Sequence, residues 1–201
     1  IVISACGKVN HNEFVKYVIN LFSGVKEKSE LVITSTHFIP QSNVIKKDLQ
    51  QSYIMMSFKG IPNEHEDKYK LDMFNTILNG GMSCRLFQEV REKYGLGYTI
   101  STMIEKCYDS GFFGIFSVVE RKDINKTITV CKNVLNSMKN SITEEEFMKA
   151  KNSVMYSVAS TKDSCGGMMS YNAISLLFKN RVDSLDETEK KLINLNIDDI
   201  Y

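Results

Sequence analysis

The spacing of apolar residues predicts strands and helices that alternate in the first half of the chain, followed by a mainly helical second half. Short apolar runs typical of strands occupy residues 1–6, 44–49, 53–58, 98–104 and 111–119, with 44–49 as a short edge strand. Apolar residues recur at helical spacing over 10–22, 67–78, 83–94, 123–138, 143–154, 167–178 and 185–195. Residues 23–41 have weak periodicity and contain Pro40, which predicts a surface excursion.

Two helix starts carry a recognisable capping pattern. Asn10 precedes the first helical stretch, with Glu13 three residues later. Thr143 precedes a later one, with Glu146 in the corresponding position. An Asn or Thr side chain accepts a hydrogen bond from the free backbone N–H groups of a first turn, and a Glu three residues on reaches back. We therefore expect helices to begin directly after Asn10 and Thr143.

The arrangement of these elements predicts the fold class. The runs 98–104 and 111–119 are joined by a short turn near Tyr108, which favours antiparallel pairing. The helices need one face of such a sheet to bury their apolar sides. We expect an α+β two-layer sandwich, with a mainly antiparallel sheet and helices packed on one face. No repeat or clean linker divides the chain, so residues 1–201 are expected to form a single domain.

Composition and charge exclude several classes of function. Charged residues make up 24% of the chain and the formal net charge is +1, so there is no general field to attract nucleic acid. No stretch approaches eighteen consecutive apolar residues, so no membrane span is expected. The five cysteines are odd in number and form no C-x-x-C pair, which indicates a reducing compartment. The apolar opening and the unterminated end predict an internal piece of a longer chain.

No metal site is expected within this chain. The histidines His11, His37 and His65 are far apart in sequence. His65 opens an H-E-x-x-H-like stretch, but Tyr69 stands where the second histidine would be. A zinc helix needs two imidazoles on one face. The chain also lacks a G-x-S-x-G elbow, and Met82 stands where a phosphate-binding loop requires Lys.

One glycine-rich stretch remains, and it reads LNGGMSCRLFQEVREKYGLGY over residues 78–98. A structural interpretation makes Gly80 and Gly81 a helix–helix corner and Gly95 a helix C-cap. It leaves unexplained why Arg91 and Tyr98 flank the point where helix turns into strand at Gly97. A guanidinium and a phenol aimed at one point can bind a peptide backbone or a developing oxyanion. Spacing alone leaves both interpretations open.

This stretch resembles the non-zinc domain of the pitrilysin-like M16 metallopeptidases, a family that includes the mitochondrial processing peptidases. Similar segments occur in the same order along most of the chain, and they read IVISACGKVNHNEFVKYVINLF, QSYIMMSFKGIP, DSGFFGIFSVV and ITEEEFMKAKNSV. The family's zinc motif, His-x-x-Glu-His, is absent. The resemblance implies that zinc is carried by a homologous partner domain, in the same chain or a dimer partner. Cys84 stands where relatives often have Ser.

The resemblance also assigns roles to two side chains. The family's Arg–Tyr pair falls on Arg91 and Tyr98, which implies that Arg91 binds the substrate backbone. Tyr98 would stabilise the oxyanion that forms at the cleaved carbonyl. The implied function is the substrate-binding domain of a zinc metalloendopeptidase that cleaves peptides or presequences, in the bacterial cytoplasm or the mitochondrial matrix. The alternative is an inactive scaffold subunit or assembly protein of the same fold.

Overall fold

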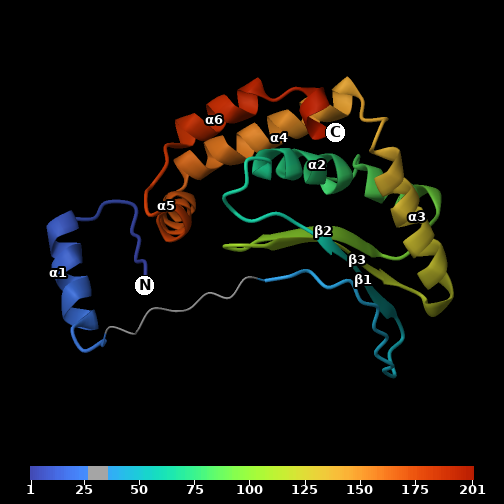
Figure 1. Ribbon diagram of the computed structural model, residues 1–201, viewed down its shortest axis with the longest axis horizontal. Coiled ribbons are helices and arrows are strands. Elements are labelled where there is room, and N and C mark those ends of the chain that lie inside the picture. Colours follow the sequence, from blue (N-terminus) through green and yellow to red (C-terminus); the bar gives the residue numbers. More distant parts are fainter. Residues whose placement is uncertain (27–35) are drawn as a thin grey trace.

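The computed structural model describes residues 1–26 and 36–201 (Figure 1). Its strands are β1 (Ser52–Lys59), β2 (Thr99–Lys106) and β3 (Gly111–Val119). Its α-helices are α1 (His11–Phe22), α2 (Lys68–Asn79), α3 (Ile124–Ser137), α4 (Glu144–Asp163), α5 (Cys165–Lys179) and α6 (Leu185–Asn194). Shorter helical segments are the π-helix η1 (Phe87–Lys93) and the 3₁₀ turns η2 (Arg121–Asp123) and η3 (Ile197–Ile200).

The three strands of the described residues form one antiparallel sheet in the order β1-β3-β2. Ser52 of β1 pairs with Val119, and Thr99 of β2 pairs with Val118. The central strand β3 is therefore hydrogen-bonded on both sides, and a short turn joins it to β2. The antiparallel pairing that the sequence predicts is confirmed.

The helices α2, α3, α4 and α6 lie on one side of the sheet (Figure 1). Between sheet and helices the core brings together buried residues of β3, α2, η1, α3 and α4. Its members are Met73, Ile77, Leu78, Leu86, Val90, Leu96, Phe113, Ile115, Val130, Cys131, Val134, Met138, Ile142, Phe147 and Ala150. This arrangement confirms the expected α+β sandwich with helices on one face.

Both predicted helix starts carry their cap. The Asn10 side chain accepts a hydrogen bond from the backbone N–H of Glu13, at 3.2 Å. Thr143 and Glu146 form the reciprocal capping box at the start of α4. Such a cap stabilises a helix by about 1 kcal/mol, because it satisfies backbone donors that have no partner within the helix.

Two predicted strands are wrong. Neither residues 1–6 nor 44–49 adopts strand structure, and neither pairs with the sheet. Ile1 is 95% exposed and Val44 is 84% exposed. An apolar run forms a strand only where a neighbouring strand offers backbone partners, and that neighbour is not encoded in the run itself.

Helix α1 stands apart from the sheet (Figure 1), and no residue of it is buried. The predicted excursion at 23–41 falls partly on residues 27–35, which lie outside the described residues. Directly after these residues, Thr36 donates two hydrogen bonds to the carboxylate of Asp109 in the β2–β3 turn. One comes from its backbone N–H, at 2.8 Å, and the other from its hydroxyl, at 2.7 Å. Among the described helices, none has the length and apolar character needed to cross a membrane.

Candidate functional site

The glycine pair after α2 forms the corner from which the site is built. Gly81 has φ of +126°, a backbone conformation that L side chains rarely adopt. At Gly80 the restriction is space instead, because an added Cβ would lie 2.3 Å from the carbonyl oxygen of Thr76. The two glycines let the chain leave α2 and start a new helical segment within a few residues.

That segment, η1, buries one side and exposes the other. Leu86 and Val90 are fully buried, and Leu96 is 3% exposed. The predicted helix over 83–94 is thus present, although it is a π-helix over Phe87–Lys93 where an α-helix was expected. The apolar spacing from Leu86 to Val90 fits one turn of either type, so the sequence does not distinguish them. π-Helical turns are rare and occur frequently at functional sites.

The end of η1 is fixed by backbone hydrogen bonds around a left-handed glycine. Gly95 has φ of +60°, and its N–H donates to the Arg91 carbonyl at 3.0 Å. The N–H of Leu96 donates to the Val90 carbonyl at 2.8 Å. These bonds satisfy carbonyl groups that a helix end otherwise leaves without a partner. Arg91 therefore sits in a last turn that is closed on the inside by Leu96.

Gly97 brings the chain against the end of β3. Its φ is +72°, and an added Cβ would lie 2.4 Å from the Val118 carbonyl oxygen. Tyr98 follows directly and is 78% exposed. By strand alternation Tyr98 is in phase with Ile100 and Ile104, which pack against the core. It escapes burial because it precedes Thr99, the first paired residue of β2.

The structure brings Arg91 and Tyr98 together. The guanidinium carbon of Arg91 lies 5.3 Å from the centre of the Tyr98 ring and 4.9 Å from that of Phe87. Such cation–π contacts contribute about 0.5–1 kcal/mol each at an exposed site. Arg85 and Arg181 each pair with a carboxylate, whereas Arg91 has no such partner within the described residues.

This pair can act on a polar ligand. A guanidinium presents five N–H donors in a planar fork, and a phenol adds one O–H donor. Both groups are exposed, and neither is hydrogen-bonded by another side chain of the described residues. Together they can bind carbonyl oxygens of an extended peptide, or the negative charge that develops on one of them.

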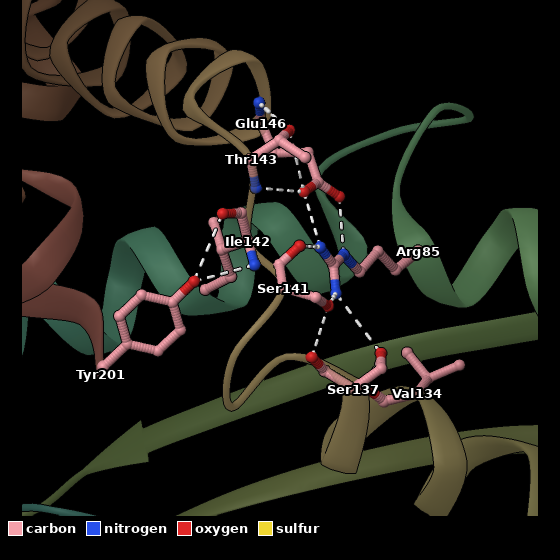
Figure 2. Close-up of polar contacts among 8 residues, drawn as sticks. All are labelled: Arg85, Val134, Ser137, Ser141, Ile142, Thr143, Glu146 and Tyr201. Carbon is pink, nitrogen blue, oxygen red and sulfur yellow. Dashed lines mark hydrogen bonds and ion pairs between the residues drawn. The ribbon is translucent and has the colours of Figure 1, made fainter.

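Sequence reasoning missed an ion pair next to the N-terminal end of η1. Arg85 forms a two-pronged contact with Glu146, in which Nε and NH2 each lie 2.6 Å from a carboxylate oxygen (Figure 2). The two side chains are 15% and 30% exposed. Hydrogen bonding from Arg85 lowers the pKa of Glu146 below its ordinary value. No local signal predicts this pair, because its members lie on separate helical segments and Glu146 was recognised only as a cap.

A hollow of about 530 Å³ lies between η1 and α3, and Arg85, Lys93, Tyr94, Asn133 and Glu146 are among its lining residues. Neither Arg91 nor Tyr98 lines it. Arg85 and Glu146 neutralise each other in this hollow, so their charged groups are already paired, whereas the guanidinium of the exposed Arg91 has no carboxylate partner among the described residues. We therefore place the candidate site at Arg91 and Tyr98, on an open surface.

The side chains do not fit a metal ion. Within residues 1–26 and 36–201, no three His, Cys, Asp or Glu side chains are grouped closely enough to hold one. His65 instead contacts Asp67, and its Nδ1 lies 3.6 Å from a carboxylate oxygen of that residue. Tyr69, which occupies the place of a second histidine, shares a hydrogen bond of 3.1 Å with Thr188.

Comparison with protein families gives a match over most of the chain. The profile of the peptidase M16 inactive domain matches residues 1–154. An uncharacterized zinc protease of Rickettsia felis is 31% identical over 150 residues, which cover 74% of this chain and 36% of that protein. One from Bacillus subtilis is 28% identical over 200 residues, covering 98% of this chain and 49% of the relative. The chain thus spans between about a third and a half of these relatives' lengths.

Solved structures share the fold. A chain of complex III2 from Candida albicans superimposes with a TM-score of 0.82 at 18% identity, over 96% of this chain and 49% of that one. At this level of identity the similarity concerns the fold alone.

Proposed function

This chain belongs to the family of peptidase M16 inactive domains, and on that premise we propose that it binds peptide substrate for a zinc metalloendopeptidase. The whole of residues 1–201 would act as the non-metal half of the enzyme. A homologous domain, in the same chain or a dimer partner, would supply the zinc, which activates the water that attacks the peptide bond. Membership of the inactive-domain family supports this division, and the names of the Rickettsia and Bacillus relatives as zinc proteases support the presence of zinc in the whole enzyme.

The observation that carries the proposal is the exposed contact between Arg91 and Tyr98. Arg91 has no carboxylate partner among the described residues, so its guanidinium remains available to carbonyl oxygens of a bound peptide. Tyr98 lies beside it and is 78% exposed. In this role Arg91 holds the substrate backbone, and the Tyr98 hydroxyl donates a hydrogen bond to the oxygen of the cleaved carbonyl as it gains negative charge.

The local structure suits this task because it fixes both groups from behind. Leu86 and Val90 anchor the inner side of η1 in the core, while Gly97 lies against β3. Positioning donors in advance avoids reorganisation during the reaction, and this is where much of the benefit of an oxyanion-binding site arises.

We propose that the partner domain also covers α1. Val15, Ile19 and Phe22 lie on one face of this helix at positions i, i+4 and i+7, and all three are exposed. A helix with an apolar face gains its stability mainly from burying that face. A homologous domain with an apolar surface is the partner that the family membership suggests.

A reducing compartment, such as the bacterial cytoplasm or the mitochondrial matrix, suits the cysteines. Cys6, Cys84, Cys107, Cys131 and Cys165 are all free thiols. Burial raises the pKa of Cys131 to about 11, which keeps it a protonated thiol at neutral pH. The bacterial relatives agree with a bacterial origin, although they name no compartment.

The alternative is an inactive scaffold, for which the likeness to a chain of complex III2 is the relevant observation. A scaffold needs the fold but has no use for an unpaired guanidinium beside an exposed phenol. We therefore favour the peptidase function.

Steady-state cleavage of a peptide by the full-length protein tests the proposal. Tyr98→Phe removes one hydroxyl and leaves the ring, and loss of such a donor lowers kcat by roughly 10²–10³-fold. Tyr108→Phe is the matched control, because Tyr108 is also exposed but lies in the β2–β3 turn. Unchanged kcat and kcat/KM in Tyr98→Phe would refute the oxyanion role.

A further inference from the structure

Arg85 precedes η1, the segment that carries Arg91, and its side chain contacts the α3–α4 corner instead of Phe87 and Tyr98. It lies four residues after Gly81 of the glycine corner and directly before Leu86, which is fully buried. Arg85 lies in the short helical turn that leads into η1. Arg91 is exposed and lacks a carboxylate partner in the described residues, whereas Arg85 is 15% exposed and paired.

The Arg85 guanidinium fastens this segment to the α3–α4 corner. Besides its two contacts with Glu146, NH2 donates to the Ser141 carbonyl at 2.5 Å. NH1 donates to the hydroxyl groups of Ser141 at 3.0 Å and Ser137 at 3.3 Å (Figure 2). One side chain thereby holds the end of α3, the connecting turn and the start of α4.

The corner to which Arg85 binds is itself fixed. Glu146 accepts from the backbone N–H of Thr143 at 2.9 Å, as part of the capping box of α4. The residue before Thr143, Ile142, donates its backbone N–H to the hydroxyl of Tyr201 at 2.9 Å. Arg85 is therefore bound to a corner that further hydrogen bonds hold together.

We propose that Arg85 is a positioning residue for Arg91. Hydrogen bonds around Gly95 and Leu96 fix the far end of η1, and the guanidinium fork of Arg85 fixes the near end. With both ends held, Arg91 keeps its place over the Tyr98 ring. Without the fork, only the buried side chains of Leu86 and Val90 hold the near end of η1, and the direction of Arg91 is less firmly fixed. In respect of catalysis this inference rests on the proposed function.

The test uses Arg85→Lys, which keeps the positive charge but cannot form the two-pronged contact with Glu146. Arg181→Lys is the matched control, because Arg181 also pairs with a carboxylate, that of Asp183, but its own side chain is 73% exposed. The first measurement needs no activity. The side-chain proton resonances of Arg91 in arginine-labelled protein report its place over the Phe87 and Tyr98 rings, since ring currents shift them.

We expect Arg85→Lys to move the Arg91 resonances toward the positions of an unstacked arginine, while Arg181→Lys leaves them unchanged. Glu146→Gln, which weakens the same contact from the other side, should move them in the same direction. Unchanged Arg91 resonances in folded Arg85→Lys and Glu146→Gln would overturn the proposal, whatever the activity of either variant.

The second measurement is kcat/KM for peptide cleavage by the full-length protein. Misplacing a binding group by about an ångström costs up to roughly 10²-fold, so we expect a loss of about tenfold in Arg85→Lys. In an Arg91→Ala background the same substitution should cause little further loss, because the two effects share one route. An equal loss in both backgrounds would overturn the positioning role. If Arg91→Ala alone leaves kcat/KM unchanged, the proposed function fails, while the resonances still decide whether Arg85 positions Arg91.

Discussion

The guanidinium of Arg91 lies over the ring of Tyr98, with 5.3 Å between the guanidinium carbon and the ring centre, although a helix end and two glycines separate the residues along the chain. In a continuous strand, seven positions would set the two residues about 23 Å apart, too far for their side chains to meet. The reversal at Gly95 and Gly97 creates the contact. The contact between Arg91 and Tyr98 therefore depends on the backbone conformation of Gly95 and Gly97.

The first prediction separates substrate binding from transition-state stabilisation. Arg91→Lys keeps a positive charge but loses the planar fork and its stacking on Phe87 and Tyr98. In the full-length protein we expect KM for a peptide to rise about tenfold with a smaller change in kcat, because the contact exists before the transition state. Arg121→Lys, an exposed arginine of η2, is the control. An unchanged KM would exclude Arg91 from substrate binding.

The second prediction compares two glycines with similar backbones but different surroundings. Gly95 and Gly97 have φ of +60° and +72°, yet only at Gly97 would a Cβ collide, with the Val118 carbonyl. We expect Gly95→Ala to lower the free energy of unfolding by about 1–2 kcal/mol, the usual cost of a left-handed backbone. Gly97→Ala should cost roughly 1–3 kcal/mol more, because β3 or the turn must shift. Urea unfolding of both variants measures this, and equal losses would contradict the close approach.

The helices and paired strands could be predicted because each carries its own periodicity of apolar residues, to which Asn10 and Thr143 add a cap. The local sequence did not indicate which strand or side chain, distant along the chain, each element would contact. The run at 1–6 is as apolar as β1, yet Ile1 stays exposed because no strand receives it. For the same reason the contact between Arg85 and Glu146, which joins two helical segments, left no pattern in either.

The candidate site was predicted in a different way. Alternation along β2 alone would have placed Tyr98 in the core with Ile100 and Ile104. Its resemblance to a family motif, together with Arg91, was the reason to expect it on the surface. That expectation came from the whole motif, since no single residue of the motif indicates whether the Tyr98 side chain is exposed or buried. Its assigned role in catalysis stays a prediction.

The third prediction concerns the exposed face of α1. Ile19 is 64% exposed, between Val15 and Phe22 on the same face. If the partner domain covers this face, Ile19→Lys buries an unpaired charge in the assembled protein, which costs several kcal/mol unless the charge escapes to water. We expect a fall in Tm of the full-length protein. Asn20→Lys, at an exposed position of α1 that faces away from Val15, Ile19 and Phe22, should leave Tm unchanged. Equal Tm values for both variants would mean that α1 remains uncovered.

The fourth prediction uses the pH dependence of the contact between Arg85 and Glu146. Hydrogen bonding from Arg85 lowers the pKa of Glu146 in the folded protein below the ordinary value of 4.5. Its contribution to stability is therefore fully present above about pH 4.5 and is lost as the pH falls through the folded-state value. Glu146→Gln should lower the free energy of unfolding at pH 7 by roughly 1–3 kcal/mol, the scale of hydrogen bonds to a charged group.

On acidification the difference between wild type and Glu146→Gln should shrink, because protonated Glu146 loses the same charge that the variant lacks. Glu144→Gln, in the same first turn of α4 but exposed, controls for the general effect of removing a carboxylate near a helix start. Urea unfolding at a series of pH values between neutral and strongly acidic supplies the measurement. A difference that stays constant across that range would mean that Glu146 acts through its shape and its cap on α4, and that its charge contributes nothing to holding Arg85.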